Sequence, residues 1–106
     1  MTAITHTPTE PRVWLLFGER RGDNAQVLAL ARMLGWQYEI KQLRWQPDYH
    51  VDPAEAGISL AGLDTAASDS LSAPWPDVVI GIGYRSAPVS RWIGQQAGRT
   101  INIRLG

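Results

Sequence analysis

The sequence predicts an α/β fold: a Rossmann-like, mostly parallel sheet of four strands in the order 2-1-3-4, with helices on its faces. Two continuous apolar runs, residues 13–17 and 78–83, are typical of strands buried on both faces. Each run leads through a short glycine-containing turn into a stretch with helical periodicity. Because each helix is followed by a further strand-like stretch, we expect parallel pairing through right-handed connections.

The first strand–helix unit covers residues 13–35. Gly18 ends the strand, and the spacing of Asp23 and Gln26 is that of a capping box, which predicts that Asp23 caps the helix. Gly35 provides the C-terminal stop. The apolar face of this helix is Val27, Leu30, Ala31 and Leu34. Residues 37–43 then alternate in polarity and predict the second strand.

A long loop is expected at about residues 46–76, where Pro, Asp, Ala, Ser and Gly predominate. One short helical turn is predicted at 52–55, from an N-cap, a proline and an acidic residue. A weak helical face is formed by Leu60, Leu63, Ala67 and Leu71. The segment is either a surface crossover or a mobile loop.

The second strand–helix unit begins after the proline-rich residues 74–77. Ser86 is the predicted N-cap of its helix, Pro88 is tolerated in the first turn, and Gly98 ends the helix. The buried face is predicted to be Val89, Trp92, Ile93 and Ala97. Residues 100–105 alternate as a fourth strand.

We expect a disordered tail at residues 1–11 and a single Rossmann-like domain at 12–106. A parallel sheet that finishes on its fourth strand leaves an edge that proteins usually shield. The sequence therefore predicts a truncated chain, completed by a C-terminal domain or by a second copy.

Composition excludes several classes of function. Ten basic and ten acidic side chains cancel, which argues against nucleic-acid partners. Cysteine is absent and only two histidines are present. The chain therefore lacks the residues needed for thiolate catalysis, a zinc site or a serine–histidine triad. No cofactor is expected. No stretch approaches the roughly 20 apolar residues of a membrane span, so a cytoplasmic protein is the default expectation.

Five tryptophans are many for a chain of 106 residues. Trp14 and Trp92 are predicted to lie in the core. Trp36, Trp45 and Trp75 flank the ends of elements, where they either pack locally under loops or line a cleft or domain interface.

The candidate site lies at the carboxyl ends of the first and third strands, where the strand order reverses. Helix N-termini and arginines meeting there favour an anionic or hydroxyl-rich ligand. The candidate ligand-binding residues are Gly18, Arg20, Arg21, Gly22, Asn24, Gly83, Arg85 and Ser86. Glu19 is the first candidate general base and Asp23 the second. The alternative is that these residues only cap helices, turn the chain or remain solvated.

Residues 81–86 are similar to the dinucleotide fingerprint G-x-G-x-x-G, but Ser86 occupies the third glycine position. The first loop, residues 18–22, does not fit the fingerprint either, and the chain has no P-loop motif. An NAD-linked oxidoreductase or epimerase is therefore poorly supported.

Two blocks resemble the mitochondrial fission ELM-like family, bacterial members of which form a domain of unknown function. The first block comprises residues 13–18, 22–26 and 34–35, and the second comprises 74–80 and 83–89. The resemblance implies a GT-B-like architecture, in which the first of two Rossmann-like domains holds the acceptor and the second holds a nucleotide-sugar donor. This chain corresponds to the first domain, so autonomous glycosyl transfer is not expected.

The resemblance thus implies the acceptor-side N-terminal domain of a glycosyltransferase-like protein, with a glycan acceptor or nucleotide-sugar as ligand. Two alternatives stay open. One is a non-enzymatic protein-interaction domain related to fission factors, peripheral to a membrane. The other is a small nucleotide-binding module that uses the crevice alone.

Overall fold

A computed structural model describes residues 10–47 and 57–106. In this part of the chain the elements are β1 (Val13–Phe17), α1 (Arg21–Leu34), β2 (Tyr38–Gln42), β3 (Val78–Ile82), α2 (Ser86–Ala97) and β4 (Ile101–Leu105). The helical turn predicted at 52–55 lies outside the described residues, as does nearly all of the predicted tail at 1–11.

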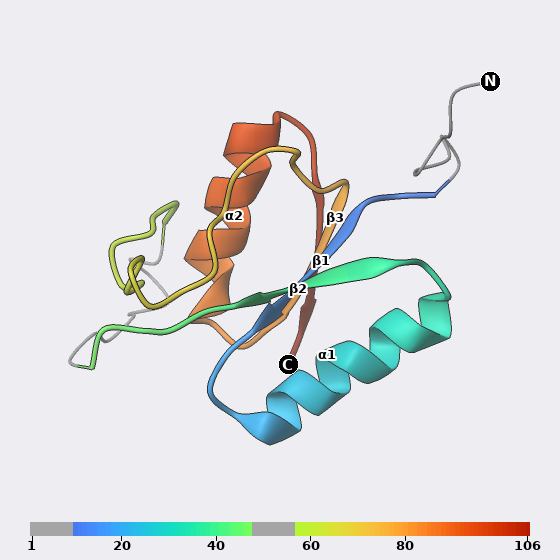
Figure 1. Cartoon of the computed structure of the whole chain (residues 1–106), viewed down its shortest axis with the longest axis horizontal. Helices are drawn as coiled ribbons and strands as arrows, with labels where there is room; N and C mark the ends of the chain where they lie inside the picture. Colours follow the sequence, from blue (N-terminus) through green and yellow to red (C-terminus); the bar gives the residue numbers. More distant parts are fainter. Residues whose placement is uncertain (1–9, 48–56) are drawn as a thin grey trace.

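The four strands form one sheet in the order β2-β1-β3-β4, and every pairing is parallel. Helices α1 and α2 lie on opposite faces of this sheet (Figure 1). The predicted fold class and strand order are therefore confirmed. The register places Leu15 between Ile40 and Ile80, so that one apolar row crosses the middle of the sheet.

The α1 face of the sheet is closed by the helix side chains Val27 and Ala31, which pack on the fully buried Leu15 and Ile80. These contacts follow from the predicted apolar stripe of the helix. Leu34, at the end of the stripe, is 36% exposed and differs from the prediction. Its position in the last turn carries it past the edge of the packed area.

The α2 face holds four of the five tryptophans, Trp14, Trp45, Trp75 and Trp92. Trp14 is buried, and Trp75 packs between Trp14 and Trp92 with ring-centroid distances of 5.9 and 5.8 Å. The Lys41 ammonium lies 4.6 Å from the centroid of the Trp14 ring, which is a cation–π distance. Trp75 therefore has a packing role, and the prediction that Trp14 lies in the core is confirmed.

The predicted cap of α1 was wrong. The helix begins at Arg21, with Arg20 as an extended N-cap whose side chain forms no capping hydrogen bond, so Asp23 lies within the first turn. The neighbouring Asn24 explains the shift, because its side-chain amide pairs with the backbone of Gly18 and fixes the chain before the helix.

The predicted cap of α2 was also wrong. Ser86 is the first helical residue, and the N-cap is Arg85. The Ser86 hydroxyl donates backward to the carbonyl oxygens of Ile82 and Gly83, both at 3.0 Å, instead of capping a forward N–H group. Pro88 falls in the first turn of the helix, as predicted.

Residues 57–76 contain no helix, so the weak helical face predicted for Leu60, Leu63, Ala67 and Leu71 was wrong. This segment, yellow-green to yellow in Figure 1, instead forms an isolated antiparallel bridge between Trp45 and Leu63. Gln42 exchanges hydrogen bonds with Asp69, at 2.7 and 2.8 Å. The segment thus follows the free edge of β2 and its continuation as a surface crossover.

No helix in residues 10–47 and 57–106 has the length and apolar character needed to span a bilayer.

Candidate functional site

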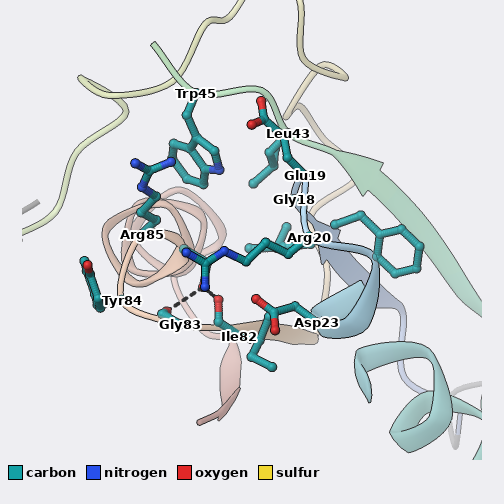
Figure 2. A pocket seen from close by; sticks show the side chains of 13 residues that line it. Gly18, Glu19, Arg20, Asp23, Leu43, Trp45, Ile82, Gly83, Tyr84 and Arg85 are labelled. Carbon is teal, nitrogen blue, oxygen red and sulfur yellow. Dashed lines mark hydrogen bonds between the residues drawn. The ribbon is translucent and has the colours of Figure 1, made fainter. Parts of the chain in front are cut away.

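A pocket of about 250 Å³ opens at the carboxyl edge of the sheet, between the β1–α1 loop and the β3–α2 loop (Figure 2). Strands β1 and β3 are neighbours whose following helices cover opposite faces, so this position is the topological switch point of the sheet. Its lining residues are Leu16, Phe17, Gly18, Glu19, Arg20, Asp23, Leu43, Trp45, Ile82, Gly83, Tyr84, Arg85 and Ser86.

The apolar part of the lining comes from the ends of β1 and β3 and from the chain that follows β2. Leu16 and Leu43 are buried and Ile82 is half-buried. A Cβ atom added at Gly18 would lie 3.8 Å from Nε1 of Trp45, which places that indole beside the first loop. The Trp45–Leu63 bridge holds the indole there.

The first loop, residues 18–20, is fixed by side chains from outside the loop. Oδ1 of Asn24 accepts from the Gly18 N–H at 2.9 Å, and Nδ2 of Asn24 donates to the Gly18 carbonyl at 3.0 Å. Nε2 of Gln42 donates to the same carbonyl at 3.0 Å. With its backbone held by α1 and β2, the loop presents the side chains of Glu19 and Arg20.

The second loop, residues 83–85, is fixed by its own backbone, by the first residues of α2 and by the end of β4. Gly83 has φ +77°, in the left-handed region that favours glycine. The N–H of Gly83 donates to the carbonyl of Leu105 at 3.2 Å, and Ala87 N–H donates to the carbonyl of Tyr84 at 3.3 Å. This turn presents Tyr84 and Arg85, which are both exposed.

Four charged side chains line the pocket, two of each sign. Arg20, Arg85 and Glu19 are exposed and Asp23 is half-buried. Within the described residues none of the four forms an ion pair. The ion pair found there joins Lys41 and Glu39 on β2 at 2.8 Å. Among the described residues, all four groups therefore lack a charged partner.

The structure brings seven of the ten predicted site residues into the lining: Gly18, Glu19, Arg20, Asp23, Gly83, Arg85 and Ser86. Arg21 and Gly22 lie exposed on the first turn of α1, outside the lining. Asn24 is also outside it and supports the first loop instead. Ser86 is buried and its hydroxyl is occupied by backbone carbonyls, so it shapes the pocket rather than offering a free donor.

The sequence prediction of the site omitted Tyr84, and it gave Trp45 only as one of three tryptophans that either pack under loops or line a cleft or interface. Both had a usable signal, because Tyr84 lies in the same turn as Arg85 and Trp45 follows the carboxyl end of β2 by three residues. Side chains that follow parallel strands at the same edge of a sheet tend to gather at one site.

Among the described residues, no group of three or more His, Asp or Glu side chains is placed to hold a metal ion.

Comparison with protein families shows that the family model described as Mitochondrial fission ELM1 matches residues 21–105. No curated protein and no solved structure matches the chain. The matched range includes the whole of α1, Arg85 of the second loop and the whole β3–α2 unit, and it begins after the first loop, residues 18–20.

Proposed function

The chain belongs to the mitochondrial fission ELM1 family, and we propose on that premise that it is the acceptor-side domain of a glycosyltransferase-like protein. A GT-B-like architecture would supply the nucleotide-sugar from a second Rossmann-like domain facing the pocket. The proposal assigns the pocket between the two βα loops to the acceptor.

The observation that carries the proposal is the combination of carboxylates with an aromatic wall in one small pocket at the switch point. Glu19 and Asp23 lie on the α1 side of the pocket, while Trp45 stands beside the first loop (Figure 2). Carboxylates accept hydrogen bonds from sugar hydroxyls, and an indole offers a flat apolar surface for a ring. A pocket of about 250 Å³ suits one ring better than a dinucleotide.

In this role Glu19 is the proposed general base. Its carboxylate takes the proton from an acceptor hydroxyl while that oxygen forms the new bond to the anomeric carbon of the donor sugar. The bond from the anomeric carbon to the nucleotide breaks, and its electron pair leaves with the nucleotide phosphate. Asp23, half-buried in the same lining, is the second candidate.

A ligand-observed NMR screen of this chain tests the proposal. Methyl glucoside, methyl galactoside and N-acetylglucosamine should bind, and Trp45→Ala should weaken their binding, whereas UDP and UDP-glucose should bind weakly or not at all. Trp36→Ala is a matched control, because Trp36 packs on the α1 face, away from the pocket. Binding of the nucleotides without the glycans would contradict the proposal and favour a nucleotide-binding module.

A second candidate function, a protein-interaction domain, is favoured by exposed apolar side chains. Met33 on α1 is 84% exposed, and Ile101 on β4 is 65% exposed. Ile101 pairs with Val78, so it lies on the α1 face of the sheet, where little covers it. This candidate would be favoured if the protein self-associates in sedimentation experiments and the Ile101→Lys variant does not. The NMR screen should then show no binding of the glycans.

A further inference from the structure

The charged groups of the pocket are arranged unevenly. In Figure 2 the guanidinium groups of Arg20 and Arg85 lie toward the second loop, the Glu19 carboxylate lies beside Leu43, and the Asp23 carboxylate lies beside Ile82 at the opposite end. The arginines and Glu19 thus occupy different parts of a pocket whose formal charge sums to zero. A ligand that matches this pattern carries a negative group at one end and hydrogen-bond donors at the other.

The arginine side of the pocket is suited to a phosphate group. Guanidinium groups bind phosphate through paired, charge-assisted hydrogen bonds. At the start of α2 the Ala87 N–H donates to the Tyr84 carbonyl and Pro88 has no N–H, so the Ser86 N–H is the one group of these first three residues that could face a ligand. The N-terminal end of α2 adds partial positive charge beside Arg85.

The end of the pocket at Glu19 is suited to a hydroxylated ring. The Glu19 carboxylate can accept hydrogen bonds from hydroxyl groups but would repel a second phosphate. Trp45 and Tyr84 provide flat surfaces on the rim, and the volume of about 250 Å³ leaves room for one ring.

We propose that the ligand of this pocket is a phosphate monoester of a single hydroxyl-rich ring, with the phosphate between Arg20 and Arg85 and the ring near Trp45 and Glu19. The inference rests on the proposed acceptor function and specifies the chemistry of the acceptor. A sugar phosphate and a nucleoside monophosphate both carry this group. The size of the pocket favours the sugar phosphate.

Isothermal titration of the chain with four probes tests the proposal: glucose 1-phosphate, methyl glucoside, AMP and inorganic phosphate. Glucose 1-phosphate should bind at least tenfold more tightly than methyl glucoside or inorganic phosphate, because only it occupies both sides of the pocket. Its affinity should fall at least tenfold in Arg20→Ala and in Arg85→Ala. Arg21→Ala is the matched control, since Arg21 is an exposed neighbour outside the lining, and it should leave the affinity unchanged.

The other outcomes separate this inference from the proposed function. Equal binding of glucose 1-phosphate and methyl glucoside, unaffected by the arginine variants, would overturn the phosphate inference and leave the acceptor function standing. Binding of AMP alone would overturn both and indicate a nucleotide site. Equal binding of inorganic phosphate and glucose 1-phosphate would overturn the role of the ring. Absence of binding by all four probes would overturn the inference.

Discussion

The β1–α1 loop and the β3–α2 loop each span three residues, 18–20 and 83–85, and both present charged side chains to the same pocket. They are held in place by different means. The first loop depends on the side-chain amides of Asn24 and Gln42, which belong to α1 and β2. The second depends on the left-handed backbone of Gly83 and on the hydroxyl of Ser86.

The difference shows that two loops of equal length need not be equally sensitive to substitutions in the elements around them. The first loop keeps its shape only while α1 and β2 stay in register with β1, because its backbone groups are bonded to side chains of those elements. The second loop is held mostly by residues next to it in sequence. Substitutions at supporting positions should therefore disturb Glu19 and Arg20 more than Tyr84 and Arg85.

The largest effect is expected for Asn24→Ala. It removes both hydrogen bonds to Gly18 and leaves a part-buried N–H group without its acceptor, which should lower the free energy of unfolding by about 1–3 kcal/mol. Urea denaturation measures this change. Gln42→Ala is the control with a smaller expected loss, because the Gly18 carbonyl keeps its bond from Asn24. Equal losses in the two variants would contradict the clamp assigned to Asn24.

Gly83→Ala should come next. Its φ of +77° lies where a side chain costs about 1–2 kcal/mol, although among the described residues nothing approaches within 4 Å of the added Cβ. The matched control is Gly22→Ala, which also meets no described neighbour but lies in the first turn of α1 and should stabilise the protein by about 0.5–1 kcal/mol. Thermal unfolding of the two variants should give shifts of opposite sign, and a shared sign would refute the comparison.

A smaller, coupled effect is expected for Gly81→Ala and Ser86→Ala. A Cβ at Gly81 would lie 3.0 Å from Oγ of Ser86, so Gly81→Ala alone should destabilise the protein by crowding. Ser86→Ala alone should destabilise it because the hydroxyl that donates to the carbonyls of Ile82 and Gly83 is lost. Together they should cost less than their sum, by about 0.5–1 kcal/mol, because the crowding atom is gone. A double-mutant cycle in urea measures the coupling. Strict additivity would mean that the neighbouring backbone moves and relieves the crowding.

The smallest effect on stability is expected for Arg20→Ala and Arg85→Ala. Both side chains are exposed, and neither forms an ion pair with the residues that the structure describes, so each change should remain within about 0.5 kcal/mol. Urea denaturation of each variant checks this. Stability loss well above that value in either variant would show that the arginine supports its loop and is not held ready for a ligand.

The sequence was sufficient to predict the sheet because its evidence was local and repeated. The apolar runs around Leu15 and Ile80 mark the two central strands, and the connections between strands restrict the pairing to a parallel order. Helix starts were predicted less well. Asp23 has a residue type and spacing suited to a cap, but the helix begins before it, at Arg21, where Asn24 is bonded to Gly18, a contact that only the folded chain shows.

The pocket was predicted in part for the same reason. Arg20 and Arg85 follow directly from the strand ends, so topology alone brings them together. Trp45 also follows a strand end, but its exact place depends on further backbone bonds such as Gln46 N–H to the Gly62 carbonyl at 2.9 Å. Hydrogen bonds between backbone groups do not depend on residue type, so they cannot be predicted from it. The segment that makes them also lacks the periodicity of a helix or strand.

The crossover along β2 has a consequence for hydrogen exchange. Gln42 and Arg44 donate their amide hydrogens to side chains of the crossover, Asp69 and Ser68, which are at most half-buried, whereas Leu15 lies in the interior of the sheet. The edge should therefore open at a lower free energy than the sheet, as a separate cooperative unit. Trp45 belongs to that unit and Leu16 belongs to the sheet, and both line the pocket. A ligand bound between them would stabilise the two units together, so it should slow amide exchange along the edge as well as in the pocket.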